Sequence, residues 1–156
     1  MTPYETAIAA LAEALEAKLE IGSDRLCDVE VDGRLVVLRP IGETEASIMM
    51  FSIAAAASDG GKLSAEVKER ALSMNLFGTN TLGGHLGLFG ESIILSAPPI
   101  EATGLSVESF AERMLAFSRF TGEVEEKLAG GAAAEDDGET FEDEADTAPE
   151  SDFIKV

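Results

Sequence analysis

Two neighbouring apolar runs, residues 35–38 and 47–54, place the strongest constraint on how this chain can fold. The second run puts Ile48 and Met50 on one side of an extended strand and Met49, Phe51 and Ile53 on the other. Two adjacent strands of this kind are apolar on both faces. Helices of the same chain can cover one face. In a chain of 156 residues, the cover of the second face can be another chain.

A hairpin precedes these runs. Cys27, Val29 and Val31 alternate with acidic residues, which predicts a strand with one buried and one solvent-exposed face. Asp32-Gly33 is a strong signal for a two-residue turn into the run at 35–38. Pro40 is expected to end that second strand, because proline cannot donate to a ladder.

Three helices are predicted around the strands. Thr2 and Glu5 form a capping-box pair about Pro3. An apolar stripe then indicates a helix that Gly22 would end, and it consists of Tyr4, Ile8, Leu11, Leu15 and Leu19. Ser64 begins a second helix, to about residue 76, and Ser106 begins a third, to residue 128.

A glycine-punctuated stretch, residues 72–97, contains the last two predicted strands. They cover about 82–88 and 92–97, and Gly90-Glu91 turns between them. The resulting order is α-β-β-β-α-β-β-α. This order predicts an α+β fold with a mostly antiparallel twisted sheet packed by helices.

Composition narrows the function classes. The formal net charge of −19 argues against binding to nucleic acid or to anionic lipid, since both need a basic surface. We expect no membrane insertion and no signal peptide, because no apolar stretch is long enough and no basic start precedes one. The single Cys27 cannot form an internal disulfide. These features predict a cytoplasmic protein.

The distribution of charge divides the chain into a body and an acidic tail. Residues 129–156 carry ten acids against one base and few apolar residues, so we predict a disordered acidic tail. Residues 1–128 would form the single folded domain.

Catalytic and metal-binding patterns are weak. His85 and Cys27 are the sole histidine and cysteine, and their pairing would require them to meet in space. The glycines from 83 to 87 match neither a dinucleotide fingerprint nor a phosphate-binding loop. The tail acids fit no calcium loop. We therefore expect no enzyme activity, no cofactor and no metal site.

Three stretches together resemble the class I type III secretion chaperones, the CesT/Tir chaperone-like family. They are the amphipathic opening helix at 4–19, the passage Ala71-Leu-Ser-Met-Asn-Leu-Phe-Gly-Thr-Asn-Thr-Leu-Gly-Gly-His-Leu-Gly-Leu, and Ile93-Ile-Leu-Ser before the link to the last helix. The resemblance covers nearly all of residues 3–128. The acidic tail exceeds the usual ending of the family.

The resemblance implies a bacterial homodimer without enzymatic activity that binds the N-terminal region of a secreted effector in extended form. It also implies delivery to the export apparatus, a further expected partner. The implied dimer surface comprises Val67, Ala71, Met74, Leu82 and Leu86. The implied effector surface comprises Leu35, Val37, Met49, Phe51 and Ile53, with Ile8 and Leu15 of the first helix as additional candidates.

Two alternatives stay open at this point. Each of these apolar residues can belong to the core of its own subunit instead of facing a partner. The whole chain can also be a small regulatory or adaptor domain of the same fold with no role in secretion.

Overall fold

The computed structural model of the chain describes residues 1–76 and 81–130. Nine helices and strands are found within these residues: α1 Pro3–Ala14, β1 Cys27–Val31, β2 Arg34–Ile41, β3 Ser47–Ala56, α2 Ala65–Asn75, β4 His85–Phe89, β5 Ser92–Ser96, β6 Ile100–Glu101 and α3 Val107–Leu128. The predicted order is therefore confirmed, with the two-residue strand β6 in addition. The predicted disordered tail, at 129–156, lies outside the described residues apart from its first two.

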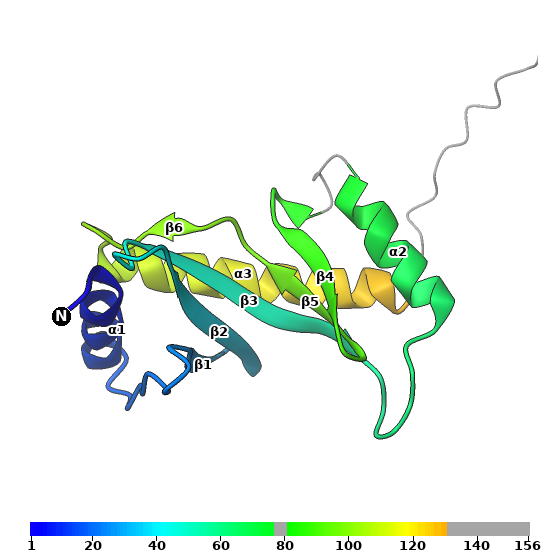
Figure 1. Cartoon of the computed structure of the whole chain (residues 1–156), viewed down its shortest axis with the longest axis horizontal. Helices are drawn as coiled ribbons and strands as arrows, with labels where there is room; N and C mark the ends of the chain where they lie inside the picture. Colours follow the sequence, from blue (N-terminus) through cyan, green and yellow to red (C-terminus); the bar gives the residue numbers. More distant parts are fainter. Residues whose placement is uncertain (77–80, 131–156) are drawn as a thin grey trace, which may run out of the picture.

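The strands form one antiparallel sheet in the order β1-β2-β3-β5-β4, and β6 pairs with the beginning of β3. Figure 1 shows the long helix α3 running behind the sheet, with α1 at one end of it and α2 beyond β4 at the other. The predicted α+β class with a helix-packed antiparallel sheet is correct. One face of the sheet rests on α3.

The core lies between this face and α3. Val36, Leu38 and Ile48 are fully buried there, and Met50 is 4% exposed. The side of α3 that faces the sheet is also buried, with residues spaced mostly three and four apart: Phe110, Met114, Phe117, Ser118, Thr121, Val124 and Leu128. Alternate residues of β2 and β3 are thereby assigned to the core, so the residues between them point to the other face.

The turn between β1 and β2 is as predicted. Asp32 and Gly33 both have positive φ angles, 53° and 73°, and Val31 is paired with Arg34. This is the geometry of a type I′ turn, whose twist matches that of the two strands. The turn fixes the register of β1 against β2 and hence the face on which each residue lies.

The prediction that the first helix continues to Gly22 is wrong, since α1 ends at Ala14. Glu16 adopts a positive φ of 50°. The Ala17 N–H donates to the Ala12 carbonyl at 3.0 Å, and the Glu16 N–H donates to the Glu13 carbonyl at 3.2 Å. These two bonds form the Schellman ending of a helix. The sequence did not indicate it because the position usually holds glycine.

Pro40 does not end the second strand, because it is paired with Ile48 inside β2. Leu38 is opposite Cys27, the first residue of β1, so Pro40 extends beyond the end of β1. Every second residue of a strand directs its backbone groups to the same neighbour. The missing N–H of Pro40 therefore points to a place where no strand of the described chain lies.

Among the described residues, no helix has both the length and the apolar character needed to cross a bilayer.

Candidate functional site

On the side opposite to α3, the sheet has a face that no helix or strand of the described residues covers. Its apolar side chains, called here the open face, are Leu35 and Val37 of β2, Met49, Phe51 and Ile53 of β3, Ile94 of β5 and Phe89 of β4. Cross-strand pairing puts them on one side, since Val37 is opposite Phe51 and Ile53 is opposite Ile94. The five residues of β2 and β3 are the ones that the sequence singled out as effector-facing.

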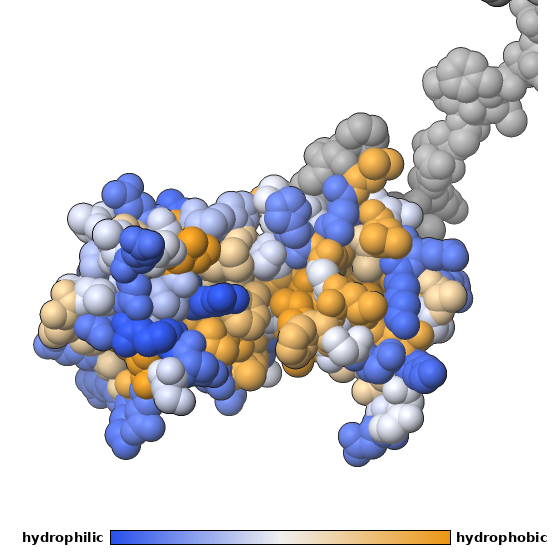
Figure 2. All heavy atoms as spheres, in the orientation of Figure 1, coloured by the Kyte–Doolittle hydropathy of each residue, from blue (hydrophilic) through white to orange (hydrophobic). Residues whose placement is uncertain are grey.

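Exposure distinguishes the open face from the core. Leu35 is 49% exposed and Ile53 is 50% exposed, whereas their neighbours Val36, Ser52 and Ala54 are buried; Phe89 is 77% exposed. Figure 2 shows hydrophobic side chains gathered over the region where β3, β4 and β5 run in Figure 1, with polar residues around them. A contiguous apolar surface of this kind marks an interaction site more often than scattered single residues do.

The two predicted effector residues of the first helix are placed differently. Ile8 is 3% exposed and packs in the core, so it is not on an accessible surface. Leu15 follows the last residue of α1 and is 45% exposed.

The residues predicted for the dimer interface lie at the other end of the molecule, on and between α2 and β4. Ala71, Met74 and Leu86 are buried within the chain, and Val67 is half-buried. Leu82 is 69% exposed. The structure thus brings the set together, but three of its members already contribute to the core of their own subunit.

Sequence reasoning missed other exposed apolar residues at this end. Leu72 of α2 is 70% exposed and Leu88 of β4 is 58% exposed. Both line a small apolar cavity of about 230 Å³, together with Lys68, Ala71, Leu86, Gly87 and Ile93. Helical spacing alone does not show which apolar residues of α2 lie outside the core.

Asn75 joins α2 to the outer edge of β4. Its side-chain amide nitrogen donates to the Leu86 carbonyl, and its amide oxygen accepts from the Leu86 N–H, both at 2.8 Å. The side chain thus takes the place that a neighbouring strand would have at the centre of β4. This edge of the sheet is closed at Leu86.

An ion cluster fixes the loop between α1 and β1. The Arg25 guanidinium donates to Glu5 Oε1 at 3.0 Å and to Glu45 Oε1 at 2.9 Å. The Thr2 backbone N–H and the Arg25 side chain lower the pKa of Glu5 by hydrogen bonding, and the Arg25 side chain, followed by the Thr2 hydroxyl, lowers the pKa of Glu45. The cluster ties the loop both to the start of α1 and to the β2–β3 connection.

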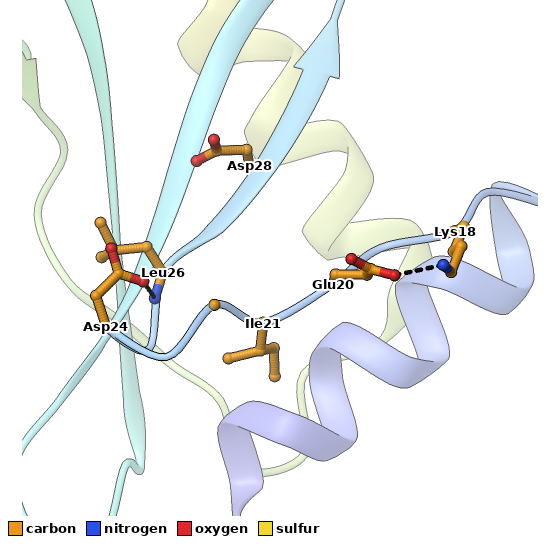
Figure 3. Close-up of a pocket in the computed structure, with 7 residues that line it drawn as sticks. Lys18, Glu20, Ile21, Asp24, Leu26 and Asp28 are labelled. Atoms are coloured by element: carbon orange, nitrogen blue, oxygen red, sulfur yellow. Dashed lines mark hydrogen bonds and ion pairs between the residues drawn. The ribbon is translucent and has the colours of Figure 1, made fainter.

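An open depression of about 640 Å³ lies between this loop and β1. Figure 3 shows Asp28 of β1 on one side of it, and Glu20, Ile21 and Asp24 of the loop on the other. Lys18 pairs with Glu20, and the Leu26 N–H donates to Asp24 Oδ1 at 3.2 Å. The lining therefore has more carboxylates than bases.

Cys27 and His85 do not form a reactive pair. They belong to β1 and β4, the two edge strands, with three strands between them. Four strand spacings correspond to about 19 Å. Burial, with a smaller effect of Asp28, raises the pKa of the Cys27 thiol, which disfavours the reactive thiolate. No group of three or more His, Cys, Asp and Glu residues in the described part of the chain is arranged to hold a metal ion.

Solved structures share this fold. The chain is similar to the type III secretion chaperone SycH of Yersinia pestis, solved with a fragment of YscM2 (17% identity, TM-score 0.54, 78% of this chain and 98% of that chain covered). It is also similar to a chain of the HopA1–SchA chaperone–effector complex (17% identity, TM-score 0.56, 80% of this chain and 94% of that chain covered). A third similar structure is a chain of the ExsC–ExsE complex (18% identity, TM-score 0.62, 82% of this chain and 97% of that chain covered).

A search of curated protein sequences finds no match. A family model does match, over residues 6–119, which span α1 to the middle of α3. The matched range includes every strand of the sheet and the whole open face. The chain belongs to the Tir chaperone protein (CesT) family.

Proposed function

We propose that this protein is a type III secretion chaperone that binds the N-terminal region of a secreted effector in extended form and keeps it soluble and secretion-competent. Membership of the Tir chaperone family supports the class of function. The open face supports the binding mode, because it is an apolar surface that residues 1–76 and 81–130 leave uncovered. We further propose that the complex forms in the bacterial cytoplasm and is delivered to the export apparatus.

The chemistry of the open face suits an unfolded segment. Leu35 and Ile53 are each about half exposed, so a bound chain can remove substantial apolar area from water. Complete burial of such a side chain is worth about 1.5–3 kcal/mol, so covering the half-exposed side chains would offset part of the entropy lost when the segment becomes ordered. Met49 adds an unbranched thioether that adapts to different partners. We propose that Leu15 extends this surface, and we leave out Ile8 because it is buried.

We propose that the protein is a homodimer that associates through α2 and β4. The exposed residues Leu72, Leu82 and Leu88 supply apolar surface at this end, beside the cavity that Ala71 and Leu86 line. The predicted contribution of Met74 is indirect, since its burial in the subunit supports the position of α2.

We propose that the protein has no enzymatic activity and needs no cofactor. The distance between Cys27 and His85 and the buried state of the thiol support this, as does the chaperone family. The second candidate function, an adaptor domain unrelated to secretion, would use the same apolar surface.

The test begins with capture from the native cell, identification of the bound protein by mass spectrometry, and titration of its isolated N-terminal segment. We expect binding to the full chain and loss of binding in the double variant Leu35→Gln with Ile53→Gln. The matched control is Glu112→Gln with Glu123→Gln, which changes two exposed side chains of α3, outside both the open face and the proposed dimer interface. A partner that binds through a folded domain, or that is not secreted, would instead support the adaptor function.

A further inference from the structure

The margin of the open face along β1 is acidic. Asp28 is exposed and opposite Val37, so its side chain lies on the side of the open face. Glu30, opposite Leu35, is also exposed and lies on the same side. Within residues 1–76 and 81–130, neither carboxylate forms an ion pair. This margin can therefore receive a basic side chain from a segment that lies over the open face.

A single base stands on the same side of β2. Arg39 is exposed, lies two residues along the strand from Val37 and is opposite Met49 of β3. It has no ion-pair partner in the described part of the chain, whereas Arg34 at the start of β2 pairs with Glu125 at 2.8 Å. An exposed guanidinium of this kind favours a carboxylate close to the apolar groups that the open face binds.

The acidic tail contains one segment with the complementary pattern. Its single cluster of large apolar side chains is Phe153-Ile154-Lys155-Val156, called here the 153–156 cluster. Lys155 is the only base of residues 131–156, and Asp152 directly precedes the cluster. The other acids of the tail would be repelled by the acidic margin, because like charges at close range are destabilising. The base within the cluster makes this segment the exception.

The spacing of the charges agrees with the spacing on the sheet. In an extended chain, Asp152 and Lys155 are about 10 Å apart. Strand geometry places Arg39 about 8 Å from Asp28 and about 14 Å from Glu30. A segment with its carboxylate at Arg39 can therefore bring its lysine to the acidic margin, with the apolar residues between them over the open face.

We propose that the 153–156 cluster covers the open face of its own chain when no effector is bound. Lys155 then lies at the margin formed by Asp28 and Glu30. The carboxylate of Asp152 lies beside Arg39. An effector segment has to displace the cluster, so the tail keeps the apolar surface covered until the effector arrives. Docking of the tail is independent of the proposed function, and only its displacement by an effector rests on that function.

The tail is long enough for this contact. It follows the end of α3, where Arg70 of α2 donates to the Leu128 carbonyl at 2.9 Å. A polar chain of the length of residues 131–152 has a root-mean-square end-to-end distance of roughly 25 Å. Five strands span only about 19 Å. Such a linker gives the cluster an effective concentration on the order of 1 mM, so a contact that is weak between separate molecules is populated within one chain.

A contact of this strength is compatible with a tail that folding does not need. When the effective concentration is close to the dissociation constant, the cluster is docked about half of the time. Half occupancy stabilises the folded state only slightly, because the gain depends on the logarithm of the ratio of the two quantities. The melting temperature should therefore shift by no more than a few degrees when the contact is lost.

Methyl spectra of the full chain test the docking without an effector. We expect the double variant Phe153→Ser with Ile154→Ser to shift the methyl signals of Leu35, Val37 and Ile53, while the buried methyls of β2 keep their positions. Dilution of the wild type should leave its signals unchanged, because the contact is within one chain. Signals that revert on dilution to those of the variant would show a second copy on the face and overturn the proposal.

Two further variants separate the cluster from the rest of the tail. Phe141→Ser, the matched control, removes the other aromatic residue of the tail and should leave the open-face signals as in the wild type. Lys155→Glu keeps every apolar residue of the cluster but should move these signals at least about half of the way to those of the double serine variant, because it places a like charge at the acidic margin. An unchanged spectrum for Lys155→Glu would exclude the contact with Asp28 and Glu30.

A peptide added to the double serine variant measures the affinity. Capped Ser-Asp-Phe-Ile-Lys-Val should restore the wild-type signals with a dissociation constant on the order of 1 mM. Its twin with glutamate in place of lysine should bind at least about threefold more weakly. In the variant Asp28→Lys with Glu30→Lys, the preference between the two peptides should be inverted, whereas Glu112→Lys with Glu123→Lys on exposed positions of α3 should retain it.

Three results would overturn the proposal: identical open-face signals in the wild type and the double serine variant, an equal effect of Phe141→Ser, or signal shifts confined to the α2–β4 end. None of them affects the chaperone function, which is tested by the binding of the effector segment. When the cluster is docked half of the time, that segment should bind the double serine variant about twofold more tightly than the wild type. Equal affinities would show that the tail does not compete with the effector.

Discussion

The side-chain amide of Asn75 forms two hydrogen bonds with the backbone of Leu86, one as donor and one as acceptor, each 2.8 Å long. The Asn75 side chain thereby makes the two hydrogen bonds with β4 that a further strand would make at this edge of the sheet. The contact couples the α2–β4 end, where we propose the dimer forms, to the register of the sheet.

Replacement of Asn75 by leucine tests this coupling. The change leaves the N–H and the carbonyl of Leu86 without their partner, and part-buried backbone groups without a partner are costly. We expect the free energy of unfolding in urea to fall by roughly 2 kcal/mol. Ser73→Ala, on the exposed side of the same helix, should change it little. A loss below about 0.5 kcal/mol for Asn75→Leu would show that water replaces the amide without cost.

The open face should tolerate polar residues. Leu35→Gln and Ile53→Gln each remove apolar area that is already half in water, so we expect a loss of stability below about 1 kcal/mol. Val36→Gln, one position from Leu35 but fully buried, should instead destabilise the chain severely. Thermal unfolding of the three variants measures the difference. Similar melting temperatures for all three would contradict the assignment of the two sheet faces.

The dimer proposal requires probes that leave the subunit folded. Met74→Glu and Leu86→Glu would place a charge in the core and unfold the subunit. Leu72→Glu with Leu88→Glu changes exposed residues, so each subunit should stay folded while the interface gains unpaired charges. Sedimentation equilibrium at micromolar concentration should give the dimer mass for the wild type and the monomer mass for this variant. A wild-type monomer would contradict the homodimer.

The ion cluster around Arg25 predicts a pH dependence. A carboxyl with a lowered pKa in the folded state binds fewer protons there than in the unfolded chain. The stability that Glu5 and Glu45 contribute is therefore complete above the ordinary carboxyl pKa of about 4.3 and is lost as the pH falls through their lower folded values. In the variant Arg25→Gln, the free energy of unfolding should decrease less steeply as the pH falls from 7 to 3, as measured by urea titration at each pH. An unchanged slope would show that other carboxyls cause it.

The tail should contribute little to folding. Its composition lacks the apolar residues that could offset the entropy of ordering it. A chain that ends at Gly130 keeps α3 and the bond from Arg70 to the Leu128 carbonyl. We expect its melting temperature to stay within a few degrees of that of the full chain, as measured by circular dichroism. A large decrease would indicate that Phe141 or Phe153-Ile154 stabilises the folded domain.

Local chemistry explains which features the sequence could predict. The turn at Asp32-Gly33 and the capping box of Thr2 and Glu5 depend on a few adjacent residues, and both are found as predicted. The end of α1 was missed because Glu16 adopts a backbone angle that its residue type does not suggest. Pro40 was misassigned because its effect depends on where the neighbouring strand ends.

In the candidate site, too, the features set by adjacent residues could be predicted, and those set by the arrangement of the whole sheet could not. Alternation correctly separated Met49, Phe51 and Ile53 from Ile48 and Met50, but it could not tell which of the two sets packs on α3. That choice depends on the arrangement of the whole sheet. Ile94 and Phe89 were missed because they join the open face only through the pairing of β3 with β5 and of β5 with β4. Ile8 and Leu86 are buried in the core, and a helical or strand pattern does not distinguish a core residue from an interface residue.

Methyl cross-saturation detects directly which methyl groups of the open face contact an extended effector segment. The full chain would be deuterated and methyl-labelled, and the protonated N-terminal segment of its effector would be saturated. We expect signal loss at Leu35, Val37, Met49 and Ile53, with the methyls of Val36 and Leu38 unaffected because they are buried on the other side of the sheet. Signal loss confined to Leu72 and Leu88 at the α2–β4 end would contradict it.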